Sequence, residues 1–111
     1  MRSYSLPKQE RLLNRKDFVN LNRLGKRYHT KHFTLIYKKT EAGITRLGIT
    51  VGRKIGNAVR RNRIKRLVRE YYRLNKKCFP LGLDIVIVAK KGAHCLNYTN
   101  IKEELSEIVL D

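Results

Sequence analysis

The segment 58–75 constrains this chain more than any other, because its residues repeat with the period of a helix that must bury one face. Viewed at 100° per residue, one side of this helix is apolar and follows the i, i+3, i+4, i+7 spacing. The apolar residues are Ile64, Leu67, Val68, Tyr71 and Leu74. The opposite side carries Val59, Asn62, Arg63, Arg66, Arg69 and Arg73. The sequence therefore predicts a helix packed along one side, with arginines on the other and Asn57 as its N-terminal cap.

The arginine-rich side lacks the mixed charges of an ordinary solvated helix face. Residues 53–77 contain eleven Lys or Arg residues and one acid, Glu70. Residues 1–102 hold all 26 Lys and Arg residues but only five of the nine acids, a net charge of +21. Such a charge destabilises a small folded domain unless a polyanion offsets it. Nucleic acid is the favoured partner, and an anionic membrane surface is the weaker alternative.

The remaining segments predict one α+β domain over residues 1–111. Residues 1–13 read as an extended basic arm, and a helix follows from Asn14 to Gly25. Alternating apolar residues predict strands over 33–39 and 45–51, which we expect to pair as a hairpin. The continuous apolar run 83–89 suits a central strand buried on both faces. A last helix begins near 97–99 and packs through Ile101, Leu105, Ile108 and Val109.

Catalytic and metal-binding patterns are missing from the sequence. The acids outside the C-terminal helix, Glu10, Asp17, Glu41, Glu70 and Asp84, are widely scattered, whereas metal-dependent nucleases need clustered carboxylates. Cys78 and Cys95 form no CxxC pair, and we expect two reduced, partly buried thiols. We therefore expect no catalytic residue and no metal ligand in this chain. A metal-free ribonuclease built on His29 and His32 is the remaining alternative.

No apolar run is long enough to cross a membrane, and the N-terminus lacks a signal-peptide core, so we expect a cytoplasmic protein. RNA is favoured over DNA, because strands precede and follow the basic helix and no helix-turn-helix or zinc module is visible. A DNA-binding regulator and a ribosomal-type structural RNA-binding protein remain as alternatives.

The string from Gly56 to Arg69, GNAVRRNRIKRLVR, closely resembles the signature of the bacterial ribonuclease P protein subunit. Its most diagnostic parts are Arg61-Asn62-Arg63 and Lys65-Arg66. The resemblance extends over nearly the whole chain, through the stretches 12–18, 47–54 and 83–89. This resemblance implies an αβββαβα order, in a two-layer sandwich with a mixed sheet and an unusual left-handed crossover around the basic helix.

The same resemblance implies a function. In the family, an RNA subunit carries the active site and removes the 5′ leader of precursor tRNA. The small basic protein docks on that RNA, holds the single-stranded leader, promotes binding of Mg²⁺ by the complex and requires no protein partner. The enzyme is thus an endoribonuclease whose catalytic site lies in the RNA, with Mg²⁺ bound mainly by the RNA subunit and the substrate.

Family roles transfer to matching positions of this chain. The residues implied to contact the catalytic RNA are Arg60, Arg61, Asn62, Arg63, Lys65, Arg66, Arg69 and Arg73. The residues implied to contact the leader are Phe18, Asn22, Ile36, Arg53 and Lys54. Two of them depart from the family pattern, because Asn22 stands where a second aromatic residue is frequent and Ile36 where tyrosine is frequent. Leader stacking is therefore expected to be weaker or differently arranged in this chain.

Overall fold

The computed structural model describes residues 7–12, 15–41 and 43–108. The helices and strands follow in the order α1, β1, β2, β3, α2, β4 and α3. Their bounds are Arg15–Leu24 for α1, Lys26–His29 for β1, Phe33–Lys39 for β2, Arg46–Thr50 for β3, Ala58–Leu74 for α2, Leu83–Ala89 for β4 and Tyr98–Leu105 for α3. The predicted αβββαβα order and α+β class are confirmed.

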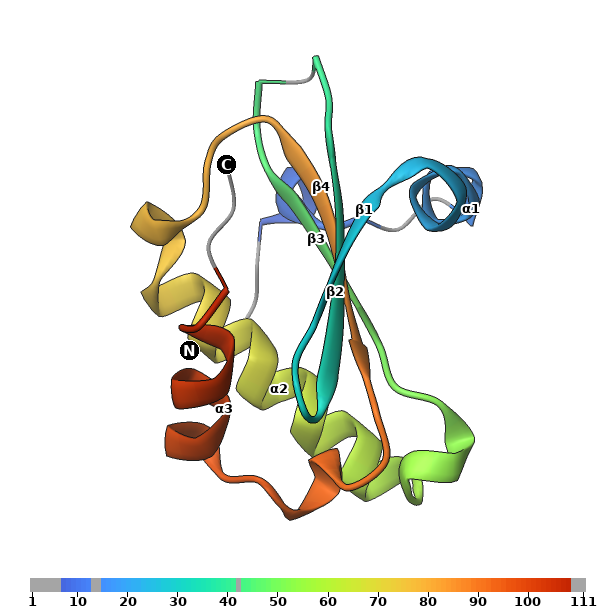
Figure 1. Cartoon of the computed structure of the whole chain (residues 1–111), viewed down its shortest axis with the longest axis vertical. Coiled ribbons are helices and arrows are strands. Elements are labelled where there is room, and N and C mark those ends of the chain that lie inside the picture. Colours follow the sequence, from blue (N-terminus) through green and yellow to red (C-terminus); the bar gives the residue numbers. More distant parts are fainter. Residues whose placement is uncertain (1–6, 13–14, 42, 109–111) are drawn as a thin grey trace.

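The four strands form one mixed sheet in the order β1-β2-β4-β3. β2 is antiparallel to β1 and β4, whereas β3 runs parallel to β4. The sheet separates α1 from the other helices, with α2 and α3 on one face and α1 on the other (Figure 1). The connection from β3 to β4 passes through α2, and its left-handed course remains a prediction.

The predicted hairpin between 33–39 and 45–51 is wrong, because β4 lies between the two strands. Six of the seven β4 residues are buried. The central position in the sheet covers both faces of this apolar strand and therefore buries more of its side chains than an edge position would. The antiparallel neighbour of β2 along the chain is instead β1. The chain returns from β2 to β3 past the start of β4, where the amide of Thr40 donates to the carbonyl of Gly82 at 2.7 Å.

Two apolar clusters fill the two sides of the sheet. The larger lies between the sheet and the helices α2 and α3, and it includes Ile64, Val68 and Tyr71 of the predicted stripe. Leu74 of that stripe is exposed instead, and Tyr72 is buried in its place. The smaller cluster lies on the α1 side and consists of Leu12, Leu21, Ile36 and Val86, with Phe18 and Val88 packed against it.

The helix ends follow their sequence signals where they are described. The side chain of Asn57 accepts a hydrogen bond from the amide of Arg60 at 3.0 Å, as predicted for the cap of α2. Asn97 begins α3 in a capping box with Asn100. The predicted cap Asn14 and the core residue Val109 lie outside the described residues.

The described part of the predicted N-terminal arm is packed against the domain. Lys8–Glu10 form a short 3-10 helix, and the amide of Leu12 donates to the carbonyl of Leu47 in β3 at 3.0 Å. Leu12 is 1% exposed, so its burial anchors this segment. Cys78 and Cys95 are free thiols, and the prediction that they are partly buried is wrong, since both are exposed. No helix within 7–12, 15–41 and 43–108 has the length and apolarity needed to cross a membrane.

Candidate nucleic-acid interface

A groove of about 490 Å³ runs between α1 and the open face of the sheet. Its apolar walls are formed by Ile36, Val86 and Val88 from the sheet and by Phe18 and Val19 from α1. Phe18 and Val88 are half-buried, and Val19 is 51% exposed, so apolar surface remains open along the groove. Such a surface can accept the flat faces of unstacked bases.

Cations and polar groups surround this apolar floor. Arg15 and Arg27 line the groove, and Arg27 Nη2 donates to the backbone carbonyl and Oδ1 of Asn22 at 2.8 and 3.2 Å. His29 Nδ1 lies 3.1 Å from Thr34 Oγ1. Phosphates of a single strand could therefore meet positive charge while its bases meet the floor.

An ionic cluster fixes α1 against the sheet beside the groove. Arg46 in β3 makes a bidentate pair with Asp84 of β4, from Nε to Oδ1 at 2.8 Å and from Nη2 to Oδ2 at 2.7 Å. Its Nη1 also lies 3.3 Å from Oδ2 of Asp17 in α1. The hydrogen bond with Asp84 raises the pKa of Arg46, although partial burial opposes the shift. Because Asp17 precedes Phe18, this cluster also orients the aromatic residue of the groove.

The predicted RNA-contacting residues all lie in α2, but their side chains differ in solvent exposure. Arg60, Asn62 and Arg66 are exposed. The other members are half-buried, namely Arg61, Arg63, Lys65, Arg69 and Arg73. Arg63 Nη1 donates to the carbonyl of Leu96 at 2.9 Å, so this arginine also ties α2 to the loop before α3.

A further cation joins the basic helix from a distant part of the chain. Partial burial lowers the pKa of Arg69, and the nearby charge of Arg11 lowers it further. Arg11 reaches this position because its segment runs beside Leu47 of β3. A pattern confined to residues 58–75 could not have identified Arg11, since its place depends on tertiary packing.

The structure brings together three of the five predicted leader-binding residues. Phe18, Asn22 and Ile36 line the groove. Arg53 and Lys54 do not line it but lie exposed in the short 3-10 helix after β3, three and four residues beyond the groove residue Thr50. The sequence interpretation missed several groove residues, namely Arg15, Val19, Arg27, His29, Thr34, Thr50, Val86 and Val88.

Several carboxylates and histidines of the described residues have partners within the chain. Glu10 pairs with Lys76 at 2.7 Å. His29 contacts Thr34, while His32 Nδ1 lies 2.7 Å from Glu104 Oε1. Among the described residues, no three His, Cys, Asp or Glu side chains are grouped as metal ligands would be. His29 and His32 therefore have different partners and do not contact a common group.

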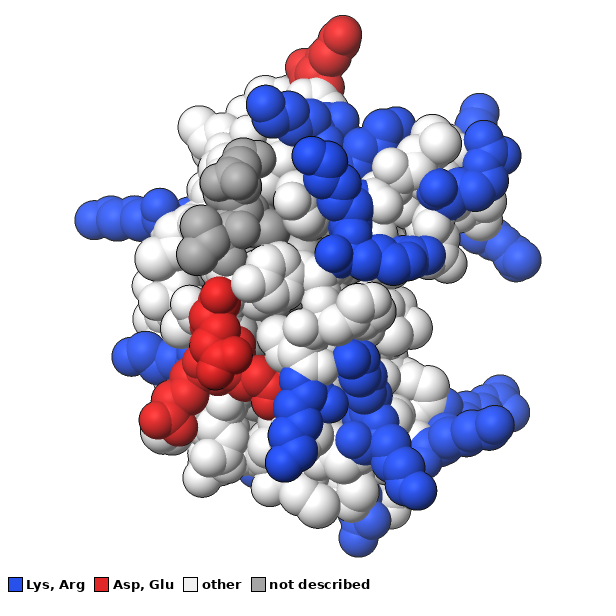
Figure 2. Space-filling view, viewed as in Figure 1, with Lys and Arg blue, Asp and Glu red and all other residues white. Residues whose placement is uncertain are grey.

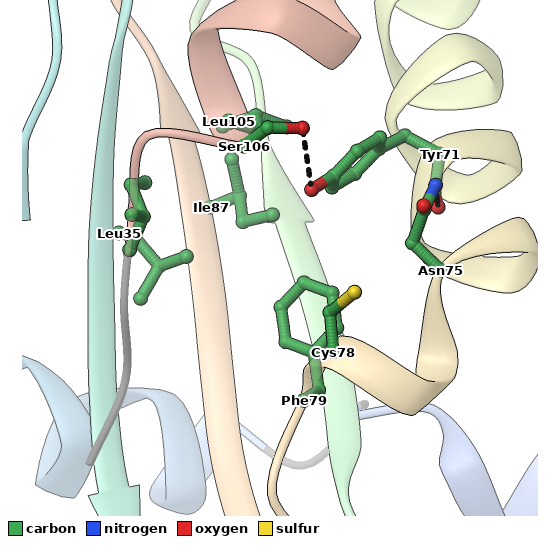
Figure 3. A pocket seen from close by; sticks show the side chains of 9 residues that line it. Leu35, Tyr71, Asn75, Cys78, Phe79, Ile87, Leu105 and Ser106 are labelled. Carbon is green, nitrogen blue, oxygen red and sulfur yellow. Dashed lines mark hydrogen bonds between the residues drawn. The ribbon is translucent and has the colours of Figure 1, made fainter.

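Two other surface features differ from the groove. Acidic side chains gather over α3 and another projects at the top of the view, whereas Lys and Arg side chains are spread over much of the rest of the visible face (Figure 2). A small cavity of about 90 Å³ lies between α2, α3 and the sheet, with Tyr71 and Ser106 pointing toward one another across it (Figure 3). Their hydroxyl oxygens are 3.5 Å apart. This cavity is much smaller than usual ligand sites of about 300–1,000 Å³, so the groove is the stronger candidate.

Known proteins resemble this chain in amino-acid sequence. The family model described as Ribonuclease P matches residues 6–111. The chain is 47% identical over 109 residues to the ribonuclease P protein component of Geotalea uraniireducens, covering 98% of this chain and 96% of that one. It is 44% identical over 109 residues to the corresponding protein of Syntrophus aciditrophicus, covering 98% and 92%.

Solved structures show the same likeness. The RNase P protein of Staphylococcus aureus superposes with a TM-score of 0.83 at 31% identity, covering 89% of this chain and 91% of that chain. The RNase P protein from Thermotoga maritima superposes with a TM-score of 0.81 at 37% identity, covering 88% and 93%. This chain is therefore similar to these proteins in sequence and in the arrangement of its helices and strands.

Proposed function

The chain belongs to the ribonuclease P protein family, and we propose that its groove holds the single-stranded 5′ leader of precursor tRNA while the arginine face of α2 docks on the catalytic RNA. Its role as a protein subunit of the ribonuclease P ribonucleoprotein follows from the family. The groove carries the proposal for the leader, because it combines an apolar floor with cations at its edge.

Shape supports this division of labour. The groove is open along the sheet, and it offers the partly exposed Phe18 and Val88 to bases without a closed pocket for one nucleotide. Stacking on an aromatic side chain tolerates any base, as a leader of variable sequence requires. The face of α2 instead presents guanidinium groups, which suit the phosphates of a folded RNA. We assign Arg53 and Lys54, which lie exposed just beyond β3, to contact with the leader where it leaves the groove.

We assign the cleavage chemistry to the RNA subunit. Among the described residues, several carboxylates already have a basic partner, since Asp17 and Asp84 bond Arg46 and Glu104 bonds His32. Mg²⁺ prefers carboxylate, phosphate and water oxygens in octahedral geometry, and RNA phosphates supply them. When bound to the RNA and the precursor, Mg²⁺ would activate the attacking water and stabilise the leaving oxygen. This chain contributes by binding the leader and reducing repulsion between the two RNAs.

Reconstitution with a bacterial ribonuclease P RNA tests the proposal. At low Mg²⁺ concentration, the protein should stimulate cleavage of precursor tRNA at the 5′ end of the mature sequence. A protein that binds ribosomal RNA but gives no stimulation would contradict it.

Replacement of Phe18 tests the leader site. Phe18→Ala should weaken binding of precursor tRNA by about 5- to 150-fold, the equivalent of one lost base stack, and leave binding of mature tRNA unchanged. Equal effects on both substrates would remove Phe18 from the leader site.

A further inference from the structure

One glycine of β3 lies directly beneath the aromatic ring of the groove. A Cβ atom built on Gly48 would lie 2.6 Å from Cζ and 2.9 Å from Cε1 of Phe18. It would also lie 3.1 Å from Cγ2 of Val86, the residue paired with Gly48 across β3 and β4. Carbon atoms pack best at about 3.5–4.0 Å, so any side chain at position 48 would displace the ring.

The residues on either side of Gly48 in β3 limit how the ring of Phe18 could move. Side chains two residues apart in a strand share one face of the sheet, so Arg46, Gly48 and Thr50 all face α1. Arg46 anchors Asp17, the residue before Phe18, while Thr50 lines the groove. The ion pair between Arg46 and Asp17 favours the present position of α1, so we expect displacement of the ring to come mainly from its side-chain torsions.

The other end of α1 is equally restricted. A Cβ atom on Gly25 would lie 2.6 Å from the carbonyl oxygen of Leu21 and 2.8 Å from Cγ2 of Ile36. The helix therefore ends in close contact with β2, and the next residue, Lys26, already pairs with Tyr37 of that strand, which holds this end on the sheet. With both ends of α1 held, the space above Gly48 is the main freedom that remains for Phe18.

From these contacts we infer that Gly48 is a positioning residue for leader recognition, because its missing side chain lets the ring of Phe18 lie down on the sheet and keeps the groove open. This inference rests on the proposed leader role of the groove. Gly48 does not contact the leader itself. It acts by setting the height and tilt of Phe18, and with them the width of the channel over Val86 and Val88.

A double-mutant cycle tests this role in the reconstituted holoenzyme. The measured quantity is the ratio of affinities for precursor tRNA and mature tRNA, which isolates the contribution of the leader. Gly48→Ala should lower this ratio by about 3- to 10-fold, less than the complete loss of one base stack. In a Phe18→Ala background the same substitution should have no further effect, since the ring that it displaces is already gone.

A matched control separates positioning from general destabilisation. Ile87→Val removes a methylene group from β4 on the opposite face of the sheet, where Ile87 is fully buried. It should lower the melting temperature and leave the affinity ratio unchanged. If Gly48→Ala alone does not fold, Phe18→Ala with Gly48→Ala should fold, because the smaller residue vacates the space. Failure of that double variant to fold would overturn the inference.

The remaining outcomes distinguish the inference from the function beneath it. A ratio that falls in Phe18→Ala but not in Gly48→Ala overturns only the role of Gly48. An equal fall caused by Gly48→Ala with and without Phe18 also overturns it, since the effect would not pass through the ring. A ratio unaffected by either single substitution removes the leader from the groove and refutes the proposed function as well.

Discussion

The groove beside α1 and the arginine face of α2 lie on opposite sides of one sheet, and both are basic. They differ in how they are built. The face of α2 comes from one continuous helix, and its charge is visible in a single stretch of sequence. The groove is assembled from α1 and all four strands, and its concave apolar floor exists only after folding. Charge alone therefore indicates a polyanion partner, whereas the different shapes of the two surfaces support the different tasks that we propose for them.

The largest expected effect concerns the ionic cluster of Arg46, Asp84 and Asp17 beside the groove. Arg46→Ala leaves Asp84, whose side chain is only 10% exposed, without its bidentate partner. The free energy of unfolding should fall by about 2–4 kcal/mol, as for other broken, mostly buried ion pairs. Urea unfolding measures this loss. Because α1 also loses its tie through Asp17, preference for precursor over mature tRNA should fall too.

Arg46→Lys provides the matched control for this cluster. It keeps the charge but cannot reproduce the two parallel hydrogen bonds, so it should be intermediate in stability. Affinity for the catalytic RNA through α2 should be preserved in both variants once they are folded. An equal loss at the two surfaces would show that they are not independent.

The next effect separates the arginines within α2. Arg66 is exposed, so Arg66→Ala should weaken binding to the catalytic RNA about tenfold at 0.1 M salt and reduce the salt slope by about one. Its melting temperature should not change. Arg63→Ala should weaken RNA binding as well but should also lower stability, because Arg63 bonds the carbonyl of Leu96. Identical melting temperatures for the two variants would contradict this distinction.

The sequence predicted the local elements well because their signals are local. The helical stripe of Ile64, Val68 and Tyr71 and the cap Asn57 depend only on near neighbours. Strand pairing is not local, and the predicted hairpin failed because the apolar β4 takes the central position between β2 and β3.

The site divides in the same way. The resemblance to a known family led to Phe18, Asn22 and Ile36, which the groove brings together. Arg27 lines the groove because β1 pairs with β2, and Arg11 lies near Arg69 because its segment forms a bridge with β3. Neither position carries a local sequence signal. The packing of the Phe18 ring over Gly48 could not be predicted from sequence either, because a glycine in a strand pattern does not reveal which side chain lies over it.

A smaller effect concerns the contact between α3 and the turn that joins β1 to β2, outside the groove. Glu104 accepts hydrogen bonds from the hydroxyl of Thr30 and from the amide of His32, the latter at 2.6 Å. Burial alone would raise the pKa of Glu104, but these bonds outweigh it and hold the pKa below its ordinary value of 4.5. The ionised carboxylate therefore stabilises the fold above pH 4.5, and this contribution is lost as the pH falls through the lowered pKa.

Glu104→Gln tests this contribution. At pH 7 the free energy of unfolding should fall by about 1–2 kcal/mol, the usual worth of hydrogen bonds to a charged group. The difference from the unaltered protein should shrink as the pH drops below 4.5, where its own Glu104 becomes protonated. The salt slope of RNA binding through α2 should stay unchanged. A difference in stability that is constant from pH 7 to pH 3 would refute the assignment.

The smallest expected effect asks how far the groove can be made to resemble its relatives. Asn22 lies one helical turn after Phe18 and occupies the groove wall, where its Oδ1 accepts from Arg27 at 3.2 Å. Asn22→Phe adds a second ring but loses this hydrogen bond on an exposed surface. Affinity for precursor tRNA should therefore rise only about two- to fivefold, below the usual value of a full base stack. Asn22→Ala, which loses the bond and adds no ring, should bind slightly more weakly than the unaltered protein. If the phenylalanine and alanine variants bind the precursor equally, a ring at this position cannot reach the leader, and stacking in this groove depends on Phe18 alone.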